Sequence, residues 1–322
     1  MGTGLETVAP AARADVERIG ARLADYLAAS TAENTRRAYA GDFAHFAAWC
    51  AQYGAAPLPA APEVVALYLS ALAETHKPAT LTRRVSAIAA AHKAAGHESP
   101  TRSDVVRDAL KGIRRTQGTA PDAKAPLTVA DVRAITREHL PAGVKGTRDA
   151  ALLLVGFAGG LRRSELVGID VEHVAFVGEG VVITLPRSKT DQDGAGRPVA
   201  IPFGAHKDTC PVRALTAWIA AAGVEAGPVF RPVNRHGQIG AGRLSGRGVA
   251  LVVKHYAAAR GRDARAYAGH SLRAGFATAA ARGGASERDI MRQTGHKSEA
   301  MVRRYIRDGN LFRANAAGAL GL

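Results

Sequence analysis

Residues 181–203 read VVITLPRSKTDQDGAGRPVAIPF, and this stretch decides between an all-helical chain and a mixed one. Two runs rich in β-branched residues flank a polar loop that contains glycine, which is the pattern of a β-hairpin. The segments around it have apolar residues spaced by three and four, as amphipathic helices do. We therefore predict a fold that is mainly α with a small antiparallel β-sheet.

The residues on either side of the hairpin extend this second domain. TVADVRAITREHL (128–140) is a predicted helix with Thr128 as its cap, and TRDAALLLVGFAGGL (147–161) is a buried helix broken by Gly159 and Gly160. The helical pattern resumes in RRSELVGI (162–169), and helices dominate from Cys210 to the end. Residues 127–322 are therefore predicted to form a mixed α+β domain.

A polar stretch separates this domain from an all-helical one. QGTAPDAKAP (117–126) contains two prolines and has no periodicity, so we interpret it as a linker. Before it, residues 1–116 contain five segments with helical spacing and suitable end signals, and they predict a compact bundle. In the third of these helices, Val64, Leu67, Tyr68 and Leu72 are expected to point inward. The five segments begin near residues 13, 34, 62, 80 and 103.

The composition indicates a polyanionic partner. The formal charge is +15 and the pI about 10.4, with 34 Arg against 9 Lys. Arginine binds phosphate oxygens in pairs, which makes nucleic acid the first candidate and an anionic membrane the second, although a GC-rich genome also enriches arginine. The most apolar run, 150–157, is too short to span a bilayer, which takes about 20 residues. Cys50 and Cys210 fit a reducing cytosol, so we expect an intracellular protein.

Several residue pairs could carry chemistry, although each is ordinary when taken alone. His270 and Arg273 in GHSLRAGF are three apart and share a helix face, as do Arg162 and Glu165 in GGLRRSEL. Lys189 lies at the tip of the predicted hairpin. Such pairs are more often structural than catalytic, so only their joint order along the chain carries information.

That joint order resembles the tyrosine recombinase (phage integrase) family, and in particular its Cre-like members. The family pattern of Arg, hairpin Lys, H-x-x-R, G-H and Tyr is matched, and the likeness extends over almost the whole chain. His296 stands where Cre itself has tryptophan, so the target site of Cre cannot be carried over. The catalytic residues implied by the resemblance are Arg162, Glu165, Lys189, His270, Arg273, His296 and Tyr305.

The resemblance implies a fold and a function. The fold is an all-helical N-terminal core-binding (SAM-like) domain followed by a mixed α+β catalytic domain. The function is site-specific recombination of double-stranded DNA with inverted-repeat half-sites, through a 3′-phosphotyrosyl intermediate and a Holliday junction. The family also implies a dimer on one site, a tetramer in the synapse, and a C-terminal helix that docks on a neighbouring protomer. Neither a cofactor nor a metal is expected, and we expect the protein to be cytoplasmic and associated with the nucleoid.

The residues themselves support this chemistry. The guanidinium groups of Arg162 and Arg273 can donate hydrogen bonds to the nonbridging phosphate oxygens, on which negative charge develops during attack. Either His270 or His296 could accept the phenolic proton of Tyr305. Lys189 would protonate the leaving 5′ oxygen, and Glu165 would hold the neighbouring donors. Two other tyrosines, Tyr256 and Tyr267, do not follow a G-H pair at the required distance.

Basic groups outside this set predict DNA contacts, although each is equally compatible with a solvated helix face. A type IB topoisomerase, or a DNA-binding protein without recombination, remains an alternative at this point. The predicted DNA-binding residues are Thr35, Arg36, Arg37, Arg83, Arg84, Lys93, Arg243 and Arg247.

Overall fold

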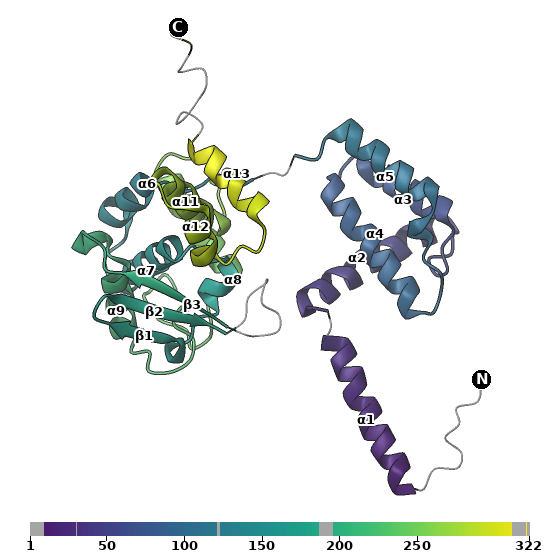
Figure 1. Cartoon of the computed structure of the whole chain (residues 1–322), viewed down its shortest axis with the longest axis horizontal. Helices are drawn as coiled ribbons and strands as arrows, with labels where there is room; N and C mark the ends of the chain where they lie inside the picture. Colours follow the sequence, from purple (N-terminus) through teal and green to yellow (C-terminus); the bar gives the residue numbers. More distant parts are fainter. Residues whose placement is uncertain (1–9, 30, 121–122, 187–195, 311–319, 321–322) are drawn as a thin grey trace. The chain divides into compact units, whose positions relative to one another are not determined.

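The chain divides into two compact units, residues 1–122 and 123–322 (Figure 1). Each unit has a hydrophobic core of its own, and we refer to them as the first and the second unit. The division falls within the stretch interpreted above as a linker. The structure is a computed structural model that describes residues 10–29, 31–120, 123–186, 196–310 and 320.

The described part of the first unit is helical. Proline occupies the first position of three of its α-helices, where a fixed φ and a missing N–H are tolerated. Its core contains Phe46, Tyr68, Leu69, Leu81 and Ile88, all fully buried. The helices are α1 (Pro10–Ala29), α2 (Glu33–Gln52), α3 (Pro62–Ala73), α4 (Pro78–Ala94) and α5 (Asp104–Gln117), with a 3-10 turn, η1 (Pro100–Arg102), before α5.

Two expectations for this unit are corrected. A compact bundle of five helices would bury the apolar residues of α1, but Ile19 and Leu23 are 57% and 55% exposed. On α3, Leu67 is 63% exposed, whereas its neighbour Val65 is fully buried. Tyr68 is fully buried as predicted, and Val64 and Leu72 pack against the core, so Leu67 is the one residue of the four that was placed wrongly.

The second unit contains a three-stranded antiparallel sheet in the order β1-β2-β3. In β2 the buried residues alternate, with Val181, Ile183 and Leu185 facing the core. The predicted hairpin corresponds to β2 and β3, and the tip that joins them lies outside the described residues. The sequence missed β1, whose Phe176 and Val177 are about half exposed and give no clear alternation. The strands are β1 (Val174–Val177), β2 (Gly180–Leu185) and β3 (Arg197–Pro202).

Helices make up most of the rest of this unit, and none of the helices in the described ranges is long and apolar enough to cross a membrane. The buried helix α7 contacts both α9 and α11 and so lies at the centre of the core (Figure 1). The elements are α6 (Val129–Ala134), η2 (Ile135–His139), α7 (Val144–Ala158), α8 (Arg163–Val167), η3 (Val171–His173), η4 (Lys207–Thr209), α9 (Pro211–Ala222), α10 (Gly246–Ala259), η5 (Ala264–Ala266), α11 (His270–Arg282), α12 (Glu287–Thr294) and α13 (Glu299–Asn310).

The first described residues of the second unit are attached to α11 and the loop before it. The backbone N–H of Ala125 donates to the carbonyl of Ala266 (2.8 Å), and that of Leu127 donates to the carbonyl of Ser271 (3.1 Å). The path passes close to Gly275, where a Cβ atom would lie 2.1 Å from the Leu127 carbonyl oxygen. Glycine at this position therefore allows the entering backbone to lie directly against the helix.

Candidate active site

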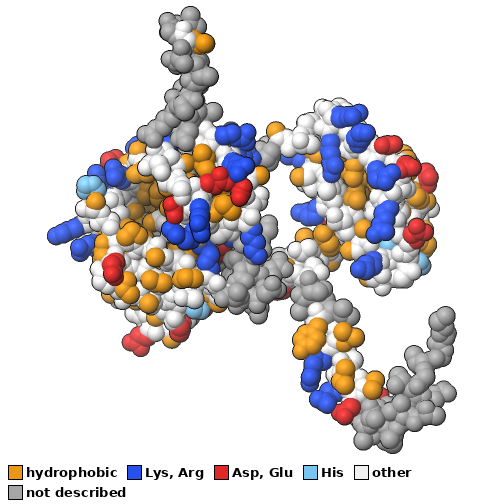
Figure 2. All heavy atoms as spheres, in the orientation of Figure 1, with side chains coloured by type: hydrophobic (Ala, Val, Ile, Leu, Met, Phe, Trp, Pro, Cys, Tyr) orange, Lys and Arg blue, Asp and Glu red, His pale blue; other side chains and the backbone are white. Residues whose placement is uncertain are grey.

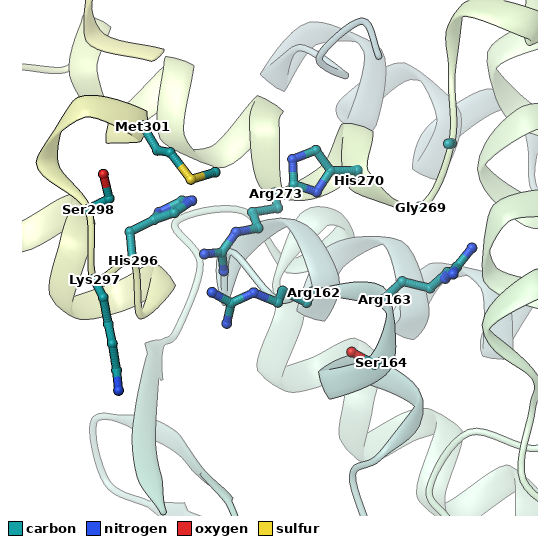
Figure 3. A pocket seen from close by; sticks show the side chains of 11 residues that line it. Arg162, Arg163, Ser164, Gly269, His270, Arg273, His296, Lys297, Ser298 and Met301 are labelled. Atoms are coloured by element: carbon teal, nitrogen blue, oxygen red, sulfur yellow. The ribbon is translucent and has the colours of Figure 1, made fainter. Parts of the chain in front are cut away.

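A cavity of about 540 Å³ opens in the second unit between α8, α11 and the turn that joins α12 to α13 (Figure 3). Two arginines lie side by side in it, and two histidines lie next to them. Arg163 is also on the cavity wall, but its side chain points away from that of Arg162. The lining residues are Arg162, Arg163, Ser164, Ala268, Gly269, His270, Arg273, His296, Lys297, Ser298 and Met301.

Arg162 is placed by the glycine break after α7. Gly160 has φ +57°, a conformation that favours glycine, and the chain then turns so that Arg162 caps α8. A Cβ atom on Gly160 would lie 2.8 Å from the Phe276 ring and 2.9 Å from the Thr294 methyl group, so space excludes a side chain as well. The break that the sequence shows as two glycines thus directs Arg162 into the cavity.

Arg273 lies one turn after His270 on α11 and is 1% exposed. Its Nη1 donates to the carbonyls of Gly160 (2.8 Å) and Thr294, while its Nη2 is buried and has no hydrogen-bond partner among the residues that the structure describes. Burial, and then the charge of Arg162, lower the pKa of Arg273 to about 10, so the side chain is still a cation at neutral pH. An unpartnered cationic N–H group in a cavity wall is a donor ready for an anionic ligand.

Glu165 provides the negative charge among these cations. It is 3% exposed, accepts the backbone N–H of Arg162 (2.8 Å) and forms an ion pair with the same guanidinium. Its Oε2 is 4.0 Å from Nη1 of Arg273 and 3.9 Å from Nη2 of Arg197. One carboxylate faces three arginines, so the site keeps a net positive charge that favours a phosphate.

His296 is a neutral ring with a defined orientation. The hydroxyl of Thr294 donates to the carbonyl of Ile290 (2.6 Å), so it accepts from Nδ1 of His296 (2.7 Å). Burial, followed by the charges of Arg273 and Arg162, lowers the pKa of His296 to about 3. With its proton on Nδ1, the ring has an unprotonated Nε2 available as an acceptor.

Tyr305 lies on α13, with its ring against a small apolar cluster that includes Val302 and Ile290. Its hydroxyl is 2.9 Å from Nε2 of His270, and its ring centroid is 5.9 Å from that of His296. Burial lowers the pKa of His270, and the charges of Arg273 and Arg162 lower it further, so this ring is also a potential proton acceptor.

The two other tyrosines considered above are poorly placed for attack on a phosphate. Tyr256 is fully buried and its hydroxyl donates to Oδ2 of Asp149 (2.7 Å). Burial and the Asp149 carboxylate raise its pKa, which is the wrong direction for a nucleophile. Tyr267 is 8% exposed. Lys189, predicted as the proton donor, lies outside the described residues.

The predicted DNA-binding residues of the first unit differ in how much they expose. Arg36, Arg37 and Lys93 are exposed, and Thr35 is half-buried. Arg83 is half-exposed, but its Nε and Nη2 donate to the two carboxylate oxygens of Asp42, at 2.7 and 3.0 Å.

Arg84 is only 7% exposed and points into the first unit. Its Nη1 donates to the hydroxyl of Tyr68, and its Nη2 lies 3.4 Å from Nε2 of His76. Little of this guanidinium remains for a phosphate, so the structure indicates a role inside the helix bundle in place of the predicted DNA contact.

In the second unit, Arg247 is exposed on the first turn of α10. Arg243 donates to Oδ1 of Asp170 (2.6 Å) and to the carbonyl of Val167 (2.6 Å), which engages its guanidinium within the protein. Within the described ranges, no group of three or more His, Cys, Asp or Glu side chains could hold a metal ion.

Sequence reasoning missed two residues at the site. Thr294 fixes the tautomer of His296, and Arg197 places a third guanidinium next to Glu165. The G-H pair at 295–296 could have directed attention to the residue before it. Arg197 is one arginine among 34 and has no motif of its own.

Comparisons with known proteins agree with this geometry. The model of the phage integrase family matches residues 126–310. An integrase/recombinase XerD homologue from Selenomonas ruminantium is 43% identical over 303 residues, covering 93% of this chain and 89% of that protein. The Cre recombinase of Escherichia phage P1 is 28% identical over 286 residues, covering 82% of this chain and 80% of that protein.

The fold agrees with a solved structure as well. The XerH site-specific recombinase bound to a palindromic difH substrate, in its post-cleavage complex, superposes with a TM-score of 0.60 and 15% identity, covering 81% of this chain and 72% of that one. The predicted fold class and the predicted resemblance are thereby confirmed. The chain belongs to the phage integrase family and is a tyrosine recombinase, an enzyme of site-specific DNA recombination.

Proposed function

We propose that Tyr305 is the nucleophile that attacks a DNA phosphodiester in the recombination reaction. The observation that carries this proposal is the 2.9 Å contact between its hydroxyl and Nε2 of His270. His270 in turn lines the cavity that holds the guanidinium groups of Arg162 and Arg273. A phenol, a base and a cationic phosphate site are therefore within reach of one another.

In the proposed step, Nε2 of His270 accepts the phenolic proton as the Tyr305 oxygen bonds to phosphorus. The bond from phosphorus to the 5′ oxygen breaks, which leaves a 3′-phosphotyrosyl linkage and a 5′ hydroxyl. The 5′ oxygen takes its proton from Lys189. His270 is favoured over His296 as the base because its Nε2 lies 2.9 Å from the hydroxyl, whereas His296 faces the tyrosine ring with the two ring centroids 5.9 Å apart.

The arginines stabilise the transition state in this proposal. Charge on the nonbridging oxygens grows as the fifth bond to phosphorus forms, and donors fixed in advance lower its energy most. Arg273 keeps its unpartnered Nη2 for this purpose, and Arg162 presents a second fork beside it. Nε2 of His296 is an acceptor, so it can take a hydrogen bond from the 5′ hydroxyl that cleavage releases and religation uses.

Religation is the same step in reverse, with the 5′ hydroxyl of a partner strand as the nucleophile. The phosphotyrosyl bond conserves the energy of the phosphodiester, so strand exchange through a Holliday junction needs no nucleotide cofactor. The negative charge of the phosphate is matched here by arginine side chains, and the proposed chemistry uses no metal.

Double-stranded DNA with inverted half-sites is the proposed substrate. In support, Lys and Arg side chains gather over α4 and α5 on the face of the first unit that Figure 2 shows. The exposed Arg36, Arg37 and Lys93 of this unit and Arg247 of the second would bind phosphates or base edges. We place the enzyme in the cytoplasm, where its DNA substrate would lie.

We also propose that the enzyme forms a dimer on each site and a tetramer when two sites meet. An apolar cavity of about 540 Å³ between β3, α11 and α12 supports this, because it includes Phe157, Phe203, Phe276 and Ile290. The C-terminal segment, which carries Leu311, Phe312 and Leu320 in the sequence, would dock there on a neighbouring protomer. Leu320 is 67% exposed in the single chain.

Covalent capture of nicked duplexes tests the proposed chemistry. The duplexes carry a target site selected from a random pool, and cleavage of a nicked duplex releases the short fragment that bears the 5′ hydroxyl. Religation then has no nucleophile, so the wild-type enzyme remains covalently attached to the DNA after denaturation. Tyr305→Phe is expected to bind the same DNA without becoming attached, since phenylalanine has no oxygen. Covalent capture by Tyr305→Phe would contradict the assignment of the nucleophile.

A further inference from the structure

Arg197 begins β3, opposite Leu185 at the end of β2. Its side chain is 20% exposed and turns toward the C-terminal end of α12. There its Nη1 donates to the carbonyls of Gln293 (2.7 Å) and Arg292 (3.2 Å). The contact is close, because a Cβ atom on Gly295 would lie 2.8 Å from Nε of Arg197.

Three arginines share the C-terminal end of α12. Arg197 donates hydrogen bonds to the carbonyls of residues 292 and 293, and Arg273 donates to that of residue 294. Arg162 donates to the carbonyl of residue 295, at 3.2 Å. The last carbonyls of a helix have no partner within the helix and carry the negative end of its dipole. The end of α12 is therefore a set of acceptors that holds cations in place before any phosphate arrives.

The side chain of Arg197 also belongs electrostatically to the same cluster. Its Nη2 is 3.9 Å from Oε2 of Glu165, too far for a hydrogen bond, and within the described part of the chain it is buried without a hydrogen-bond partner. Burial lowers the pKa of Arg197, and the charge of Arg162 adds to this effect while Glu165 opposes it. A buried cation in this position is costly, so its two carbonyl contacts are what hold it there.

His296 follows directly after this end of α12. The turn from Thr294 to His296 is therefore held by Arg273 and Arg162, and the carbonyls just before it are held by Arg197. If Arg197 is removed, two carbonyls lose their donor and the end of α12 is free to shift. Such a shift carries with it both the His296 ring and the Thr294 carbonyl that orients Arg273.

We propose that Arg197 is a positioning residue for DNA cleavage, which fixes the end of α12 so that His296 and Arg273 face the scissile phosphate. The proposal rests on the catalytic roles proposed above for those two residues. Arg197 itself acts through the carbonyls of α12, and its effect falls on the rate of the chemical step more than on DNA affinity.

Three variants of the full-length chain test it. Arg197→Met removes the donors and keeps much of the side-chain volume, while Arg197→Lys keeps a cation that can reach one carbonyl at a time. Arg288→Met is the matched control: it removes a cation from α12 itself, and the Arg288 side chain is exposed. Thermal unfolding of each variant shows whether it folds.

The readouts are the single-turnover rate of covalent capture with enzyme in excess, and the Kd for the same duplex. A misplacement of about 1 Å can cost about 100-fold in rate, so Arg197→Met is expected to cleave about 10-fold to 100-fold more slowly. Its Kd should stay within about threefold, because phosphate contacts across the whole duplex determine affinity. Arg197→Lys should lie between Arg197→Met and the wild type, and Arg288→Met should match the wild type.

Two results overturn the proposal: a folded Arg197→Met that cleaves at the wild-type rate, or one that loses affinity but cleaves normally once saturated. If Arg197→Met does not fold, Arg197→Lys decides, and a wild-type rate in that variant also overturns it. Tyr305→Phe in the same assay keeps the two proposals apart. Capture by Tyr305→Phe contradicts the proposed nucleophile, whereas a normal Arg197→Met beside an inactive Tyr305→Phe contradicts only the role of Arg197.

Discussion

Replacing Gly160 by alanine tests how the break after α7 builds the active site. Gly160 and Gly223 both have φ +57°, but a Cβ atom on Gly223 would meet nothing within 4 Å. Gly223→Ala therefore measures the conformational penalty alone, which is about 1–2 kcal/mol. At Gly160 the new methyl group also meets Phe276 at 2.8 Å and Thr294 at 2.9 Å.

Overpacking of this kind adds about 1–3 kcal/mol, so Gly160→Ala should lose about 2–5 kcal/mol of unfolding free energy in total. The loss is measured by urea unfolding with the fluorescence of Trp218, which is fully buried in the second unit. The chain has two tryptophans, so Trp49→Phe in every variant restricts the signal to this unit.

Activity provides a second measurement on the same variants. Because the Gly160 carbonyl accepts a hydrogen bond from Arg273, Gly160→Ala should also slow covalent capture, while Gly223→Ala should not. Equal losses of stability in the two alanine variants would refute the steric argument. A normal capture rate in Gly160→Ala would refute the link between this turn and Arg273.

Three further predictions concern the cations and bases of the protein. Burial and the neighbouring arginines lower the pKa of His270 below its ordinary value of about 6.5, so the ring is still neutral at pH 6.5. The single-turnover rate of covalent capture should therefore be constant from pH 8 down to about pH 6.5 and fall only at lower pH. A fall in this rate centred above about pH 6.5 would contradict His270 as the base. Arg273→Lys should lose about 100-fold or more in capture rate, as measured with enzyme in excess, because it removes a preorganised donor, and a loss of less than about tenfold would argue against a transition-state role. Arg247→Ala should reduce the slope of log Kd against log salt by roughly one unit, whereas Arg243→Ala, whose cation is already paired with Asp170, should change it less; equal slopes would show that Arg247 contacts no phosphate.

The residues that sequence order could place are those whose role depends on spacing along one element. His270 and Arg273, three apart on α11, both line the cavity as the spacing indicates. The two glycines at 159–160 marked the break that positions Arg162. In these cases the local geometry of a helix or a turn carries the information, and the sequence displays it directly.

Other features depend on tertiary packing and were not visible. Arg83 and Arg84 are adjacent and chemically identical, yet a rotation of about 100° per residue leaves one half-exposed and buries the other. Arg197 reaches the active site from a different part of the chain, through carbonyl groups that every residue has. Backbone acceptors leave no trace in the sequence, so their partners cannot be found from it.

The way in which the chain enters the second unit has a mechanical consequence. The N–H groups of Ala125 and Leu127 are tied to the carbonyls of Ala266 and Ser271, which lie just before and just within the helix that begins at His270. Tension along the chain at Ala125 therefore acts on the N-terminal end of α11 before it acts on the strands of the sheet. A force that reaches Ala125 along the chain has, in these two hydrogen bonds, a short route to the histidine that contacts the tyrosine hydroxyl.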